Sequence, residues 1–189
     1  FDDRVPAIVT MLRGMVSEEV VIRAADRDLH SGLYGGMTRN PLHVLSQILA
    51  TLHDGNGRVQ LPGFYDGVRD TPPHLSAQWQ SLNFSHQSFL GEVGLRLPAG
   101  ETAYSPLEHI CARPTCEING VCGGYTGEGF KTVLPSQASA KISCRLVEGQ
   151  DPKKIRTALR EHVCSHLPAD CSVEFTSFGA SPAVVMPSA

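Results

Sequence analysis

Residues 137–147 read QASAKISCRLV, and their pattern decides the fold more clearly than any other stretch of the chain. Small or apolar side chains alternate with polar ones, which predicts a strand with one covered face and one solvent-facing face. The side chains predicted to point inward are Ala138, Ala140, Ile142, Cys144 and Leu146. Those predicted to point outward are Ser139, Lys141, Ser143 and Arg145.

Three further strands are predicted around this one. Residues 115–122 alternate more weakly, with Cys116, Ile118, Gly120 and Cys122 assigned to the inward face. Asn119 then shares the polar face with Arg145. Residues 19–28 are rich in Val and Ile and predict a first strand, and residues 172–178 predict a last one.

Two helices are predicted between these strands. Asn40 and Asp151 are candidate N-caps, each followed by a proline at the first helical position. Apolar residues recur at helical spacing behind both caps. His162 and His166 lie four residues apart on the second helix, a spacing that can bind zinc, but no third ligand is evident nearby. We therefore interpret both histidines as helix surface.

The order of elements predicts an α+β fold of the ferredoxin-like, split βαβ type. We expect a four-stranded antiparallel sheet with two helices on one face and a long insertion after the first helix. The insertion, residues 58–112, is rich in Pro, Gly, His and aromatic residues, and short helices are predicted in its centre. Residues 1–17 are interpreted as a linker, residues 18–180 as the domain, and residues 181–189 as an exit segment.

The composition excludes several classes of partner. The formal net charge is −3 and there is no basic block, so neither nucleic acid nor an anionic membrane is expected as a partner. Apolar runs are too short for a transmembrane helix. None of the six cysteines forms a C-x-x-C pair, which favours reduced thiols and a cytoplasmic protein.

Residues 28–36 read DLHSGLYGG and place His30 in a glycine-rich turn between a strand and a helix. With residues 120–135, GVCGGYTGEGFKTVLP, and the strand end 143–147, this motif resembles the lid, or dimerisation, domain of the dinuclear-zinc exopeptidases. That family includes acetylornithine deacetylase, succinyl-diaminopimelate desuccinylase and carnosinase. The resemblance covers nearly the whole chain and is closest to the carnosinase-like dipeptidases.

The resemblance implies roles for five residues. His30 would reach the active site of the partner subunit and hydrogen-bond the scissile carbonyl as its oxygen becomes negative. Arg145 would bind the carboxylate of the substrate through two parallel bonds. Thr132, Asn119 and Lys131 would contribute to the substrate pocket. From its position alone, Arg145 is equally compatible with an ordinary solvated surface charge, and a lysine on a loop such as that of Lys131 is usually just solvated.

The metal ligands of that family are absent from this sequence. The chain contains no His-x-Asp pair, and its one Glu-Glu pair, Glu18 and Glu19, is interpreted as solvated surface charge. We therefore expect no metal or other cofactor in this chain and two zinc ions in the missing catalytic domain of the parent. The parent is expected to be a zinc metallopeptidase, a dipeptidase-like hydrolase, and the isolated chain to be inactive.

The resemblance also implies partners. We expect a homodimer formed through lid–lid contacts, contact with the protein's own catalytic domain, and a peptide or N-acyl amino acid as substrate. Two alternatives stay open: a freestanding ferredoxin-like module for ligand binding or protein interaction, and the lid of a deacylase or amidase of the same family.

Overall fold

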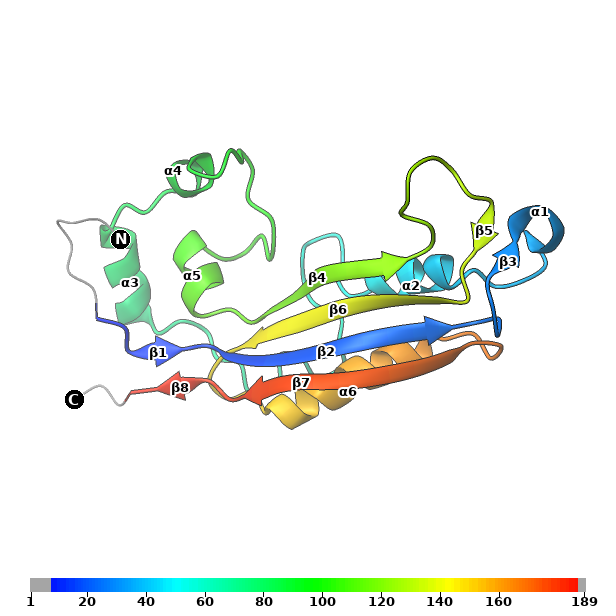
Figure 1. Cartoon of the computed structure of the whole chain (residues 1–189). Helices are drawn as coiled ribbons and strands as arrows, with labels where there is room; N and C mark the ends of the chain where they lie inside the picture. Colours follow the sequence, from blue (N-terminus) through cyan, green and yellow to red (C-terminus); the bar gives the residue numbers. More distant parts are fainter. Residues whose placement is uncertain (1–7, 187–189) are drawn as a thin grey trace.

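A four-stranded antiparallel sheet forms the centre of the computed structural model, which describes residues 8–186 (Figure 1). In spatial order its strands are β4 (Thr115–Gly123), β6 (Gln137–Leu146), β2 (Gly14–Arg23) and β7 (Ser172–Ser181). Each strand is antiparallel to its neighbours. The predicted α+β class and the four-stranded antiparallel sheet are confirmed.

The two main helices begin at the predicted caps. In α2 (Pro41–Ala50), the Asn40 side chain accepts a hydrogen bond from the Leu42 N–H at 2.9 Å. In α6 (Pro152–Ser165), the Asp151 carboxylate accepts one from the Lys153 N–H at 2.8 Å. Both helices lie behind the sheet in Figure 1 and share one hydrophobic core with its inward side chains. That set includes all five inward residues predicted for β6, namely Ala138, Ala140, Ile142, Cys144 and Leu146.

The first long strand is displaced from its predicted position. It runs from Gly14 to Arg23, where residues 19–28 were predicted, so it begins inside the segment interpreted as a linker. The Val and Ile content marks the middle of this strand, whereas its ends are set by pairing with β6, from Gly14 opposite Leu146 to Arg23 opposite Gln137. Beyond Arg23 the backbone bends before the short strand β3 (Leu29–His30).

The interpretation of Glu18 as surface charge is wrong. Glu18 is only 1% exposed and lies on the inward face beneath α6. Its Oε2 accepts hydrogen bonds from Arg160 Nη2 at 2.7 Å and Nε at 3.0 Å, and Arg156 Nε lies 2.6 Å from its Oε1. A buried carboxylate is tolerated when cations pair with it, and here one helix supplies two.

Strand β4 contains a bulge that reverses its pattern. The register with β6 shifts between Ile118 and Gly120, which makes Asn119 the extra residue. Cys122 therefore lies opposite the outward Ser139 and is exposed, so its predicted inward position is wrong. Cys116 is buried, as predicted. All six cysteines, which all lie within residues 8–186, are free thiols.

The insertion divides into a core segment and a separate lobe. Val59, Leu61 and Phe64 are buried in the main core, so residues 59–64 are part of the core although they were assigned to the insertion. The helices α3 (Pro73–Ser81), α4 (His86–Gly91) and α5 (Pro106–Cys111) form the lobe at the left in Figure 1. The short helices predicted in the centre are confirmed. The start of α5 was missed, although Ser105 and Glu108 form a capping box.

Short elements complete the two ends of the fold. At the left of Figure 1, β1 (Met11–Leu12) pairs with β8 (Val184–Val185), which lies in the predicted exit segment. At the right, α1 (Ser31–Tyr34) follows β3, and β3 pairs with β5 (Val133–Leu134). The outer parts of the predicted linker and exit segment, residues 1–7 and 187–189, lie outside the described residues. Among the described helices, none has the length and apolar character needed to span a bilayer.

Candidate functional site

The His30 corner consists of β3, α1 and β5, at the right-hand end of the sheet in Figure 1. His30 is opposite Val133 in the β3–β5 ladder, and the Ser31 N–H donates to Thr132 O at 3.0 Å. The ladder thus brings two of the predicted site residues, His30 and Thr132, side by side although 102 positions separate them. Both side chains are exposed.

The hydrogen bonds of His30 determine its tautomer. The Gly32 N–H donates to His30 Nδ1 at 2.9 Å. A backbone N–H can only donate, so Nδ1 is the acceptor and the neutral ring carries its hydrogen on Nε2. Nε2 lies 3.3 Å from Thr132 Oγ1, which accepts from it. The exposed imidazole therefore carries an N–H donor, and the Thr132 hydroxyl is its partner in this structure.

Two further residues of the motif shape this corner. A Cβ atom at Gly32 would lie 2.7 Å from His30 Cε1, so a side chain here would force the ring away from its present position. Asp28 Oδ1 accepts hydrogen bonds from the Ser136 N–H at 2.8 Å and the Ser136 hydroxyl at 3.0 Å. These bonds hold the pKa of the Asp28 carboxyl below its usual value. The contact joins residues 108 positions apart, and nothing in the local pattern indicated it.

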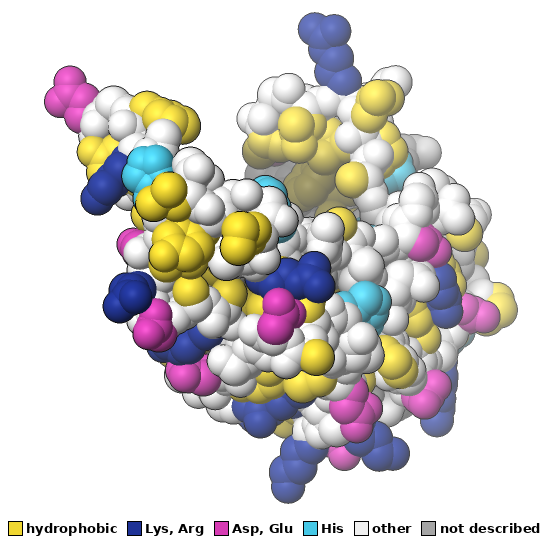
Figure 2. Space-filling view, turned by 90° about the vertical axis from the view of Figure 1, so that its right-hand side faces the viewer, with side chains coloured by type: hydrophobic (Ala, Val, Ile, Leu, Met, Phe, Trp, Pro, Cys, Tyr) yellow, Lys and Arg dark blue, Asp and Glu magenta, His cyan; other side chains and the backbone are white. Residues whose placement is uncertain are grey.

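The glycine-rich loop between β4 and β5 projects beside the corner. Within it, the Tyr125 hydroxyl donates to Glu128 O at 2.8 Å, and Lys131 Nζ lies 5.8 Å from the centre of the Tyr125 ring. Phe130 is 90% exposed. Figure 2, which faces this end, shows hydrophobic and charged side chains on a projection that stands clear of the body. Lys131 thus lies next to Thr132 on an exposed loop.

Arg145 lies far from the corner. It is exposed near the end of β6, opposite Met15 and Thr115, whereas the corner joins the sheet where Gln137 begins β6. Arg145 comes eight residues after Gln137 in this strand, a rise of about 26 Å. Asn119, in the bulge of β4, is exposed about midway along the sheet. The structure therefore groups His30, Thr132 and Lys131 and leaves Arg145 at the other end.

Arg13 is a second cation at the Arg145 end that the sequence analysis missed. Its Nη1 donates to the carbonyl oxygens of His109 and Arg113, each at 3.5 Å. Burial, and then the nearby Arg145 guanidinium, lower the pKa of Arg13. Among the described residues, no acidic side chain forms an ion pair with either Arg13 or Arg145. This end of the polar face is therefore cationic.

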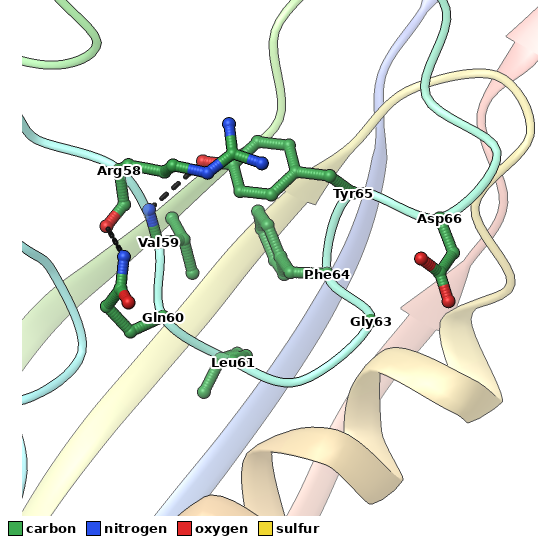
Figure 3. Close-up of a pocket in the computed structure, with 8 residues that line it drawn as sticks. All are labelled: Arg58, Val59, Gln60, Leu61, Gly63, Phe64, Tyr65 and Asp66. Atoms are coloured by element: carbon green, nitrogen blue, oxygen red, sulfur yellow. Dashed lines mark hydrogen bonds between the residues drawn. The ribbon is translucent and has the colours of Figure 1, made fainter.

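A hollow in the first part of the insertion, lined by residues between Arg58 and Asp66, has a structural role (Figure 3). The Arg58 guanidinium lies 3.9 Å from the centre of the Tyr65 ring, and the Tyr65 hydroxyl accepts from the Val59 N–H at 3.0 Å. Gln60 Nε2 donates to Arg58 O at 3.1 Å. Because these polar groups are bonded to one another, the hollow holds the segment in place and presents no reactive pair.

Within residues 8–186, no three His, Cys, Asp or Glu side chains are grouped so that they could hold a metal ion. His162 is 6% exposed, so its interpretation as helix surface is wrong, whereas His166 is exposed. The Thr51 hydroxyl donates to Ile48 O at 2.7 Å, so His162 Nε2–H donates to Thr51 Oγ1 at 2.8 Å. His162 falls seven residues after Ile155 on the apolar stripe of α6, which is the signal that could have predicted its burial.

Comparison with known proteins gives one consistent result. A family described as "Peptidase dimerisation domain" matches residues 10–171. The Cys-Gly metallodipeptidase of Candida albicans is 29% identical over 160 residues, which are 85% of this chain and 33% of that protein. The human Beta-Ala-His dipeptidase is 29% identical over 164 residues, which are 87% of this chain and 32% of that protein.

A solved structure supports the same relationship. An M20 family metallo-carboxypeptidase from Sulfolobus solfataricus matches with a TM-score of 0.82 and 31% identity, over 95% of this chain and 46% of that chain. The chain spans about a third of the length of the curated relatives that it matches.

Proposed function

Because the chain belongs to the peptidase dimerisation domain family, we propose that it is the dimerisation and substrate-capping domain of a zinc-dependent dipeptidase. The names of two relatives, a metallodipeptidase and a dipeptidase, support this class of parent. In this proposal the sheet is ferredoxin-like, with α2 and α6 as its two crossover helices. Family membership favours this function over a freestanding binding module.

In the proposed reaction, His30 donates its Nε2–H to the scissile carbonyl oxygen as negative charge develops there. Loss of one such donor typically costs about 3 kcal/mol of transition-state stabilisation. Arg145 binds the carboxylate of the substrate through its two-pronged guanidinium. Thr132, Asn119 and Lys131 contribute to the pocket, with Thr132 Oγ1 holding the imidazole until the substrate replaces it.

The separation of Arg145 from the His30 corner is the observation that carries this proposal. The corner joins β6 about 26 Å from Arg145, whereas an extended dipeptide spans about 7 Å. One small substrate therefore cannot contact both residues of the same chain. Two copies of the chain solve this problem, because His30 of one copy can complete a site that contains Arg145 of the other.

The edge strand β4 is the surface through which we propose that two lids pair. Its outer backbone groups have no strand partner among the described residues, and an unpaired edge readily adds another strand. Ile118 and Val121 on this strand are 43% and 57% exposed. Pairing at this edge, with help from the adjacent helix α2, gives a homodimer with a continuous sheet.

The residues of this chain are not expected to bind the metal of the parent. The described residues do not fit a metal site, so no step is assigned to a metal here. We propose that the parent's own catalytic domain holds two zinc ions and that its substrate is a dipeptide. The isolated chain is then inactive.

Mixed dimers of the full-length parent test the proposal. His30→Ala and Arg145→Ala should each abolish most of the activity when alone. When the two variants are mixed, each mixed dimer regains one complete site, with His30 from one copy and Arg145 from the other. Absence of any recovery, with mixed dimers demonstrated by sedimentation, would contradict action in trans.

A reciprocal control sharpens this experiment. The double variant His30→Ala/Arg145→Ala is mixed with the unaltered parent. If the residues act in trans, both sites of the mixed dimer are incomplete and its activity is lost. If both residues act in one chain, the unaltered copy keeps its full site and half of the activity remains.

Two related activities are distinguished by the substrate. The similarity to a metallo-carboxypeptidase favours a carboxypeptidase as the second candidate, because that substrate also carries a free carboxylate for Arg145. Acetylating the amino end of the peptide should abolish turnover by a dipeptidase and leave that by a carboxypeptidase. A preference for N-acyl amino acids would instead indicate a deacylase or amidase parent.

A further inference from the structure

We propose that Asp28 and Gly32 are positioning residues that hold the His30 ring with its hydrogen on Nε2, beside Thr132 Oγ1, within a single chain and before substrate or partner arrives. This inference rests on the proposed role of His30. Asp28 and Gly32 would together explain why the imidazole acts as a hydrogen-bond donor through Nε2.

Asp28 stabilises the short β3–β5 ladder that carries His30. The β3–β5 ladder contains only two residues on each strand, and such a short ladder is marginal in water. The Asp28 carboxylate adds two hydrogen bonds to Ser136 next to the ladder, and bonds to a charged acceptor are the stronger kind. Ser136 O also accepts from the Ala24 N–H at 3.1 Å, so Ser136 is anchored on both sides. Asp28 thereby ties the His30 strand to the Thr132 strand.

Gly32 fixes the tautomer of the His30 ring. Its N–H bonds to Nδ1 at 2.9 Å, and this bond requires that Nδ1 carry no hydrogen. In the opposite tautomer, Nε2 would be an acceptor and would face a substrate carbonyl oxygen with its lone pair. A side chain at position 32 would displace the ring, because its Cβ would lie 2.7 Å from Cε1 and 3.0 Å from Nδ1.

Such pre-organisation has a catalytic consequence. A donor that is already oriented loses little conformational entropy when the oxyanion forms, and small errors in its placement lower the rate of reaction. His30 is exposed, so packing does not orient it, and hydrogen bonds from its own motif must do so. This explains why an aspartate and a glycine flank the histidine at these spacings.

The first experiment uses the 189-residue chain and NMR. In the unaltered chain, His30 should carry its hydrogen on Nε2, and the Ser31 amide should be protected by its bond to Thr132 O. Asp28→Ala should accelerate exchange of the Ser31 amide by about tenfold or more. The matched control is Asp26→Ala, which removes an exposed acid whose ion pair in the described structure, at 3.9 Å, is with its neighbour Arg27. Equal exchange in the two variants would overturn the inference for Asp28.

The second experiment addresses Gly32. Gly32→Ala should shift His30 toward a mixture of tautomers, read from the ring nitrogen resonances. Gly55→Ala is the control, because a Cβ there meets no atom within 4 Å. An unchanged Nε2–H tautomer in Gly32→Ala would overturn the inference for that residue.

Kinetics of the parent separate this inference from the proposed function. Asp28→Ala should lower kcat more than it changes KM, and it should cause no further loss when His30 is already alanine. If the corner loosens in the isolated chain and kcat is unchanged, the positioning role stands and the proposed role of His30 fails. If kcat falls equally with and without His30, Asp28 does not act through His30 and the inference is overturned.

Discussion

The inner and outer faces of the sheet use charged residues in opposite ways. On the inner face, Glu18 is 1% exposed and is neutralised by Arg156 and Arg160. On the outer face, Arg145 is exposed, and among the described residues no acid pairs with it. Removing one member of a buried ion pair leaves the other charge uncompensated and destabilises the fold, whereas an exposed charge without a partner is available to a ligand. We therefore expect inner-face substitutions to change stability and outer-face substitutions to change activity.

The largest effect is expected on the inner face. Glu18→Ala leaves two arginines without their shared carboxylate and should lower the free energy of unfolding by about 3 kcal/mol, since both arginines keep some access to water. Glu19→Ala, one residue further along β2 and half-buried, should cost less than about 0.5 kcal/mol. Urea unfolding of both variants measures the difference. Similar costs would show that the burial of Glu18 does not matter.

The next effect belongs to the outer face. In the full-length parent, Arg145→Ala should raise KM by roughly 10- to 100-fold, because a two-pronged bond to the substrate carboxylate is lost. Its melting temperature should not change. Arg145→Lys should recover only part of the loss, since lysine cannot form both bonds. Lys141→Ala, on the same face and strand, is the control and should leave KM unchanged.

The two edges of the sheet provide the third test. Val121→Lys places a charge on the exposed edge strand β4 and should weaken dimerisation by about tenfold or more, because the charge opposes pairing at an edge. Thr176→Lys makes the same change on the other edge strand, β7, and should have little effect. Sedimentation velocity across a concentration series measures both. A loss confined to Thr176→Lys would move the interface to β7.

The smallest effect concerns His162 on the inner side. Burial, and then the charge of His166, lower the pKa of His162. The unfolded chain therefore binds a proton more readily, and stability should fall as the pH drops below about 6.5, levelling off below the folded-state pKa. His162→Phe should flatten this part of the pH profile, measured by thermal unfolding. His43→Gln, at an exposed site on α2, should leave the profile unchanged.

Local signals in the sequence predicted much of the fold. The caps Asn40 and Asp151 lie within a few residues of the helices that they begin, so their pattern was sufficient. The alternation of β6 predicted its buried face correctly, because side-chain direction in a strand depends only on the strand itself. The start of α5, from its capping box, and the burial of His162, from its place on the apolar stripe of α6, could also have been predicted from the sequence, but both were missed.

Other features depended on contacts between distant segments. The cations that pair with buried Glu18 come from the distant helix α6, and one extra residue at Asn119, defined by the pairing with β6, turns Cys122 outward. Phe64 is buried in the core, and Gln150, 86 positions away, donates a hydrogen bond to its carbonyl oxygen. Nothing near Phe64 in the chain indicates this contact.

The candidate site shows the same division. By itself the sequence determined the His30 motif, including the glycine that lets the ring accept a backbone N–H, since these residues act on one another over two positions. Only the tertiary structure decided that Asp28 and Thr132 meet this corner and that Arg145 does not. Those contacts join segments about a hundred residues apart, so they form only when pairing of the strands sets the register.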